Sequence, residues 1–222
     1  MRLAVGTEIF AQALLFDMDG TLVDSRQLVE TVWKNWCDAH DVDFDWVLPQ
    51  LHGVRLVDSV RRFTPDGYDV ELEIQTMYDI ELRGTAGIVP IRGALELLRS
   101  LPTDRWTIVT SADQELARAR LGVSGITPPP QMVGGDDVQE GKPHPAGYLE
   151  GARRLGYPAA QTLVFEDAVA GILAGQAAGA RVLALATGHP GEIPEGVDWI
   201  PDMASLQYVG VSADGVQLRV VA

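Results

Sequence analysis

Two aspartates separated by one residue, Asp17 and Asp19, are the strongest chemical signal in the chain. They follow a short apolar run, residues 12–16, that ends abruptly at the first of them. Carboxylates two residues apart at a strand exit project to the same side, and they repel each other unless a cation or a proton lies between them. A helix N-cap would explain only one of the two. A calcium loop does not fit, because Gly20 comes fourth in the pattern where such a loop has its glycine sixth.

A second acidic pair, Glu166 and Asp167, follows another apolar run, residues 162–165. If the two strands end at the same edge of a sheet, up to four carboxylates converge there. Oxygen ligands without histidine or cysteine suit Mg²⁺, so the two pairs together predict a magnesium site. The alternative for Asp167 is an N-cap of the helix that follows it.

Two further positions could bind an anion. Lys142 lies in a loop between a glycine and a proline, where a lysine is ordinarily a solvated charge. Thr110 and Ser111 follow the apolar run 106–109 and could simply end a strand. Hydroxyls and backbone N–H groups that open a helix also form an anion cradle, so both interpretations stay open.

The elements that would position these residues alternate along the chain. Short apolar runs typical of buried parallel strands are followed by helical patterns at 114–121 and 168–178, and the strands are expected at 12–16, 106–109, 162–165 and 181–186. This alternation predicts an α/β fold, a Rossmann-like parallel sheet with helices on both faces. In such sheets ligands bind beyond the carboxyl ends of the strands, which is where the polar residues lie.

One segment interrupts the alternation. Residues 25–91 show helical periodicity broken by glycine and proline, and they are too many for a connecting loop. We therefore expect an inserted small all-α cap domain at 25–91 and a catalytic core made of 1–24 and 92–222. The tail at 208–221, with Asp214 and Gly215 between alternating residues, predicts an appended β-hairpin.

The composition of the chain disfavours some classes of binding partner and indicates a cellular compartment. The chain has 222 residues, 17 Lys and Arg against 31 Asp and Glu, and a net charge of −14. Such an acidic surface repels phosphate backbones and anionic lipid, which disfavours nucleic acid and membranes as partners. The single cysteine, Cys37, lies on an apolar helical face beside Trp36 and is expected in a core. One cysteine cannot form an internal disulfide, and we recognise no signal peptide or membrane span, so a cytoplasmic protein is predicted.

Four motifs in order resemble those of the haloacid dehalogenase superfamily of phosphatases, and the resemblance covers nearly the whole chain. The first is LLFDMDGTLVDS at 14–25, and the others are Thr110-Ser111, Lys142-Pro143 and VFEDA at 164–168. The insert resembles the small helical cap of that family. Details of the cap and of the third motif look most like the branch of glycerol-phosphate, 2-deoxyglucose-6-phosphate and related sugar phosphatases, with β-phosphoglucomutase as a cousin.

This resemblance implies a role for each motif residue. Asp17 would attack the phosphoryl group and form an aspartyl-phosphate, and Asp19 would protonate the leaving alcohol and then activate water. Mg²⁺ would be held by Asp17, the backbone carbonyl of Asp19, and Asp167. Glu166 would support these ligands, and direct contact of Glu166 with the metal is the alternative. Lys142 would hold phosphoryl oxygens, together with one of the hydroxyls at 110 and 111.

The cap would select the substrate. His52 and Arg55 are the candidate substrate-binding residues there, and His144 and His189, beside prolines, are interpreted as structural. We expect a monomer or small homo-oligomer that hydrolyses small sugar or polyol phosphates. A β-phosphoglucomutase-like phosphotransferase is the first alternative and would need cap cations. A non-catalytic phospho-ligand-binding module is the second.

Overall fold

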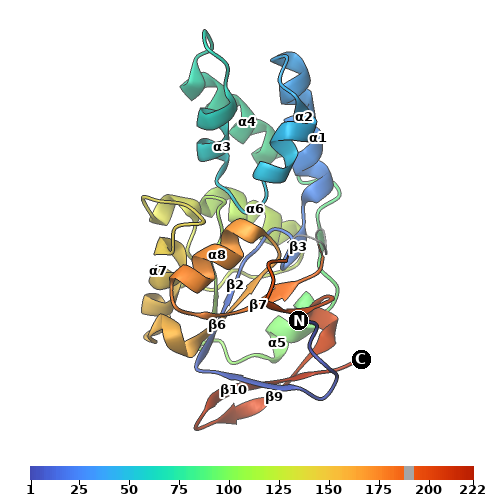
Figure 1. The fold of residues 1–222 in the computed structure, drawn as a ribbon, viewed down its shortest axis with the longest axis vertical. Coiled ribbons are helices and arrows are strands. Elements are labelled where there is room, and N and C mark those ends of the chain that lie inside the picture. Colours follow the sequence, from blue (N-terminus) through green and yellow to red (C-terminus); the bar gives the residue numbers. More distant parts are fainter. Residues whose placement is uncertain (188–192) are drawn as a thin grey trace.

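A five-stranded parallel sheet forms the centre of the computed structural model, which describes residues 1–187 and 193–222 (Figure 1). Its spatial order is β5 (Trp106–Ile108), β2 (Ala13–Phe16), β6 (Thr162–Glu166), β7 (Arg181–Leu185) and β8 (Asp198–Ile200). Every neighbouring pair is parallel, so the predicted sheet is confirmed. The four predicted strands differ from their predicted ranges by one residue at one end, and the edge strand β8 was not predicted.

Helices cover both faces of this sheet, as predicted. Their bounds are α5 (Ala94–Ser100), α6 (Gln114–Val123), α7 (Ala146–Leu155) and α8 (Val169–Ala177). Side chains alternate along β2, so Leu14 and Phe16 pack in a cluster with α5 and α6, whereas Leu15 packs in a cluster with α7 and α8. All four residues of β2 are buried, which explains why that strand is apolar on both faces.

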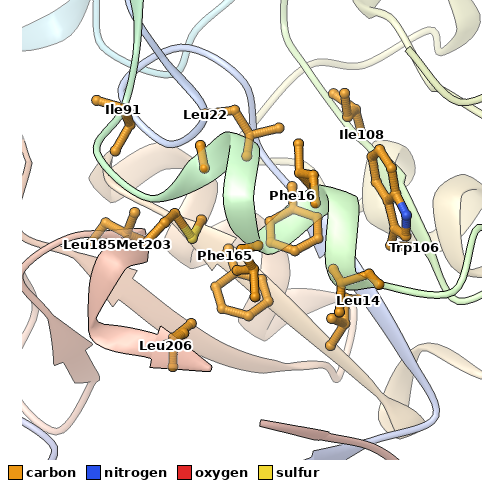
Figure 2. Close-up of a cluster of buried hydrophobic side chains, with 14 of the residues drawn as sticks. Leu14, Phe16, Leu22, Ile91, Trp106, Ile108, Phe165, Leu185, Met203 and Leu206 are labelled. Carbon is orange, nitrogen blue, oxygen red and sulfur yellow. The ribbon is translucent and has the colours of Figure 1, made fainter. Parts of the chain in front are cut away.

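Aromatic stacking fixes the strand that carries the first motif. The rings of Phe16 and Phe165 stack with centroids 4.5 Å apart, and Trp106 meets Phe16 edge-on at 6.1 Å (Figure 2). These three side chains come from β2, β6 and β5, which are the three strands that lead to the motif residues. The core packing therefore holds the ends of these strands in fixed register.

The insert is helical and lies beyond the carboxyl ends of the strands (Figure 1). It consists of α1 (Arg26–Ala39), α2 (Phe44–Val47), α3 (Leu56–Phe63) and α4 (Val70–Arg83). These helices share a hydrophobic cluster that includes Trp33, Trp36, Cys37, Phe63 and Met77, so Cys37 is a core residue as expected. A separate core of this kind supports the proposed cap at 25–91, whose exact boundaries stay a prediction.

A short antiparallel pair, β3 (Val23–Asp24) and β4 (Val89–Pro90), joins the two ends of the insert. In the part of the chain that the structure describes, 3-10 turns lie at Leu48–Gln50, Gly135–Asp137, Ala159–Gln161 and Met203–Ser205. Within the described residues, no helix is both long and apolar enough to cross a membrane.

The predicted C-terminal hairpin is present as β9 (Leu206–Ser212) and β10 (Gly215–Val220). A third strand that is not predicted from the sequence, β1 (Glu8–Ala11), pairs antiparallel with β10. The three strands form a small sheet at the end of the molecule away from the cap (Figure 1).

Candidate active site

Three neighbouring strands bring the predicted polar residues to one edge of the sheet. Asp17 follows β2, Thr110 lies two residues after β5, and Glu166 and Asp167 end and follow β6. The backbone N–H of Asp17 donates to the carbonyl of Phe165 at 2.9 Å, which ties the exits of β2 and β6 together. The topology therefore gathers the motifs as the sequence predicted.

Lys142 is buried between two of these carboxylates. Its Nζ donates to Asp17 Oδ1 at 2.5 Å, to Glu166 Oε1 at 2.6 Å and to the carbonyl of Val109 at 3.3 Å. Burial opposes the charged form, but the two carboxylates outweigh burial and raise the pKa of Lys142. The interpretation as a solvated surface lysine is therefore wrong, and a fixed positive charge lies beside Asp17.

Glu166 has partners on both oxygens. Oε1 also accepts from the hydroxyl of Tyr148 at 2.7 Å, and Oε2 accepts from the backbone N–H groups of Asp167 and Ala168 at 3.0 and 3.2 Å. A Cβ on Gly171 would lie 1.6 Å from Oε1, so glycine is required there to make room for the carboxylate. Glu166 is consequently locked in a position that orients Lys142.

Asp167 is held on the other side of the cluster. Its Oδ1 accepts from the hydroxyl of Thr21 at 3.2 Å. Gly20, at φ +85°, passes so close that a Cβ there would lie 1.9 Å from Asp167 Oδ2. The glycine of the first motif thus permits both the left-handed backbone and the approach of the fourth motif.

Asp17, Glu166 and Asp167 can each place one oxygen within 4.8 Å of the others. Burial, followed by the charge of Glu166, raises the pKa of Asp17 to about 8 despite the opposing effect of Lys142. Burial and the charge of Asp17 likewise raise the pKa of Asp167 well above its usual value. Crowded buried carboxylates of this kind are stabilised by a cation, and their all-oxygen donor set fits a hard divalent ion.

Asp19 faces a different set of partners. Its Oδ1 accepts from the hydroxyl of Ser25 at 2.5 Å, and its Oδ2 accepts from Arg120 at 2.9 Å. A second nitrogen of Arg120, on α6, donates to Glu81 of α4 at 2.7 Å. Neither Arg120 nor Glu81 is among the site residues predicted from the sequence. One signal existed for Arg120, because it lies one helical turn after the buried Leu116 and thus on the buried face of α6.

A cleft of about 380 Å³ lies between the helical insert and the strand ends. Its core side includes Asp17, Asp19, Thr110, Ser111 and Asp167, and its cap side includes Trp33, His52, Arg55, Tyr78 and Glu81. The cleft therefore joins the carboxylate cluster to the candidate residues of the cap.

The two hydroxyls predicted to bind phosphate differ in their contacts. Thr110 Oγ1 accepts from the backbone N–H of Ala112 at 3.1 Å. Ser111 Oγ donates to the carbonyl of Gly53, in the insert, at 2.7 Å. Both line the cleft, so the choice between them stays a prediction.

Arg55 is committed to protein partners. Its guanidinium donates to both oxygens of Asp58 at 2.6 and 3.0 Å and to the carbonyls of Gly135 and Val138 at 3.4 and 3.2 Å. These contacts fasten the insert to the core beside Ser111. His52 lines the cleft, His144 is on the surface, and His189 lies outside the described residues.

Comparisons with known proteins show which family the chain belongs to. The sequence profile of the haloacid dehalogenase-like hydrolases matches residues 11–179. The chain is 40% identical to hexitol phosphatase A of Escherichia coli (strain K12) over 178 residues, which cover 78% of this chain and 82% of that relative. It is 34% identical to glycerol-1-phosphate phosphohydrolase 2 of Saccharomyces cerevisiae over 186 residues, covering 79% and 74% of the two chains.

A solved hydrolase structure from Pseudomonas syringae has the same fold, with a TM-score of 0.75 and 25% identity over 86% of this chain and 94% of that one. The predicted resemblance to phosphatases of this superfamily is thereby confirmed, and the chain belongs to the haloacid dehalogenase-like hydrolases.

Proposed function

We propose that the protein hydrolyses phosphate monoesters of small sugars or polyols, with Mg²⁺ and through an aspartyl-phosphate on Asp17. The observation that carries this proposal is the buried contact of Lys142 with Asp17 and Glu166, directly below a cleft that the insert covers. The relatives named for hexitol and glycerol phosphate support the substrate class. The predicted cytoplasmic location stays a prediction.

Asp17 acts as the nucleophile. One of its carboxylate oxygens forms a bond to phosphorus while the bond between phosphorus and the ester oxygen breaks. Lys142 keeps the carboxylate in place and offers its positive charge to the phosphoryl oxygens, together with Thr110 or Ser111, which line the cleft.

The carboxylates of Asp17 and Asp167 and the backbone carbonyl of Asp19 would hold Mg²⁺, with Glu166 supporting them through Lys142. When bound, the ion supplies positive charge that offsets the repulsion between the carboxylates and the phosphate. The raised pKa values of Asp17 and Asp167 are consistent with this arrangement, because they reflect carboxylates that lack enough neutralising charge.

Asp19 serves both half-reactions. It gives a proton to the departing alkoxide, and its carboxylate then takes a proton from the water that attacks the aspartyl-phosphate. The second attack breaks the bond between phosphorus and Asp17, so that phosphate leaves and both aspartates return to their starting states. Asp19 lines the cleft with 29% of its side chain exposed, as an acid and base for a bound ester must be.

The cap arginines favour a phosphatase over the mutase alternative. A second phosphate would need an uncommitted cation in the cleft, but Arg55 binds Asp58 and two carbonyls. Arg26, the other insert arginine that lines the cleft, is paired with both oxygens of Asp24 at 3.1 and 3.0 Å. Three further arginines of the insert do not line the cleft: Arg61 pairs with Glu71, Arg83 pairs with Asp79, and Arg62 lies over the ring of Phe63. We therefore assign an uncharged, hydroxylated leaving group to this end of the cleft.

A phosphate-release screen tests the proposal. Purified protein with Mg²⁺ is given hexitol, hexose, glycerol and other metabolite phosphates, and Asp17→Asn serves as the negative control. We expect phosphate release in proportion to substrate consumed, with the greatest rate on a sugar or polyol monophosphate. Hexose 1-phosphate plus a bisphosphate activator tests the alternative, and near-quantitative 6-phosphate with little free phosphate would overturn the assignment as a phosphatase.

A further inference from the structure

Asp19 is fixed from two sides that both lead to the insert. Ser25, which holds Oδ1, immediately precedes α1, the first helix of the insert. It is the N-cap residue of α1, yet its side chain makes no capping hydrogen bond, because its hydroxyl is directed to Asp19. Arg120, which holds Oδ2, binds the insert through Glu81.

The second connection is an ion triad at the seam between α4 and α6. The side chains of Arg120 and Glu81 are 4% and 5% exposed, and the guanidinium bridges Glu81 and Asp19 at 2.7 and 2.9 Å. The same seam contains Tyr78, whose hydroxyl lies 3.1 Å from Asp113 and 3.2 Å from Glu115. Tyr78 and Glu81 are three residues apart, and therefore on one face of α4.

Stability alone does not call for this triad. Removing charges from water is costly, and well-packed apolar side chains of similar volume are often at least as stable as a buried ion pair or triad. What the triad provides is direction, because the planar guanidinium places two carboxylates at fixed angles to each other. One of them lies in the loop of the first motif and the other on a cap helix.

We infer that Arg120 is a positioning residue that holds Asp19 toward the leaving oxygen, and that Glu81 makes this position depend on α4 packing against α6. The inference rests on the proposed function, since it assigns Arg120 to the step in which Asp19 protonates the leaving group. Arg120 contacts neither Asp17 nor Lys142 in the described structure, so its effect should be confined to that step.

The leaving group provides the readout. An alkoxide needs a proton to depart, whereas 4-nitrophenolate departs well without one. kcat/KM reports the steps up to loss of the leaving group and excludes hydrolysis of the aspartyl-phosphate. A residue that acts through Asp19 should therefore lower kcat/KM for an alkyl phosphate much more than for an aryl phosphate, whereas a residue needed only for folding lowers both equally.

The experiment compares Arg120→Met, Arg120→Lys and Glu81→Gln with the wild type, using glycerol phosphate or hexitol phosphate and 4-nitrophenyl phosphate at saturating Mg²⁺. Arg83→Met is the matched control, because it removes a cap arginine that is 82% exposed and paired only with Asp79 among the described residues. For Arg120→Met we expect about a 30-fold loss on the alkyl phosphate and at most about threefold on the aryl phosphate. Glu81→Gln should show the same selectivity with a smaller loss, Arg120→Lys should be intermediate, and Arg83→Met should match the wild type.

Equal losses on both substrates would overturn the positioning role, and a Glu81→Gln variant with wild-type values would overturn the dependence on the cap. If Arg120→Met fails to fold, Arg120→Lys and Glu81→Gln decide by the same ratio of losses. A wild-type protein that releases no phosphate from any ester would instead overturn the proposed function, and this inference with it.

Discussion

The two ends of the cleft are constructed in different ways. At the strand ends, Lys142 joins Asp17 and Glu166 entirely within the core, at 2.5 and 2.6 Å. At the cap, the polar contacts cross between insert and core, as in the bond from Ser111 to Gly53. The contacts of the first end involve no residue of the insert, whereas those of the second exist only while the insert is packed against the core. We therefore expect attack by Asp17 to depend on the first end, and protonation of the leaving group and substrate selectivity to depend on the second.

The largest effect should come from Asp17→Asn. This change keeps the shape of the side chain but removes the nucleophilic charge, so hydrolysis should fall to background on alkyl and aryl phosphates alike. Phosphate release measures the activity, and a melting curve checks that the variant folds. Mg²⁺-dependent turnover that survived in this variant would contradict the aspartyl-phosphate and place the chemistry elsewhere in the cleft.

Metal removal should also abolish activity, with restoration by Mg²⁺ and inhibition by Ca²⁺, whose larger and looser shell misplaces the reacting groups. The folded-state pKa values of Asp17, about 8, and of Asp167 lie above those of the unfolded chain. Each group therefore stabilises the metal-free fold at low pH, and this contribution is lost as the pH rises, for Asp17 as the pH approaches about 8. Because Mg²⁺ can replace the proton, the rise in Tm on adding Mg²⁺ should be greater at pH 8 than at pH 6.

The control for this prediction is Asp167→Asn, which should reduce the effect of Mg²⁺ on Tm at both pH values. A rise in Tm that was the same at pH 6 and pH 8, or full activity in excess chelator, would exclude the carboxylate cluster as the metal site.

Most of the core end could be predicted from the sequence. Asp17, Glu166 and Asp167 directly follow or end short apolar strands, and parallel strands bring such residues to one edge. Lys142 could not be placed this way, because its loop reaches Asp17 only through the packing of α7 on the sheet. Its assignment came from the resemblance of its motif to those of a known family.

The cap end could be predicted only in part. Charged residues on helices ordinarily face water, and nothing local to Glu81 shows that it meets Arg120, 39 positions away, with both side chains buried. The pairing depends on how α4 packs on α6. In the same way β1 was missed because its partner, β10, lies some two hundred residues further along the chain. Long-range packing of this kind leaves no pattern in neighbouring residues.

Asp19 lies in the loop of the first motif and is held by contacts that lead to the insert, so it connects the two ends of the cleft. Asp19→Asn should have the next largest effect. It removes acid and base functions together, a loss commonly on the order of a hundredfold or more. Steady-state kinetics on a polyol phosphate should show this loss in kcat. A merely twofold decrease would leave Asp19 with only its backbone carbonyl as a functional group, and the role of Arg120 would have no basis.

The smallest effects should come from the cap residues His52 and Arg55. Their variants distinguish a residue that binds the substrate from one that holds the insert against the core. His52 lines the cleft, so His52→Ala should lower kcat/KM for the preferred polyol phosphate about three- to tenfold, the contribution of one hydrogen bond, with little change for an aryl phosphate.

The guanidinium of Arg55 instead holds the insert to the core through Gly135 and Val138, so Arg55→Ala should lower kcat/KM for both substrates together. Asp58→Asn, which weakens only the support of Arg55, is the control and should resemble Arg55→Ala at smaller amplitude. Equal losses on both substrates in His52→Ala would remove that residue from recognition, and a loss confined to the polyol phosphate in Arg55→Ala would return Arg55 to the substrate-binding role that the sequence predicts.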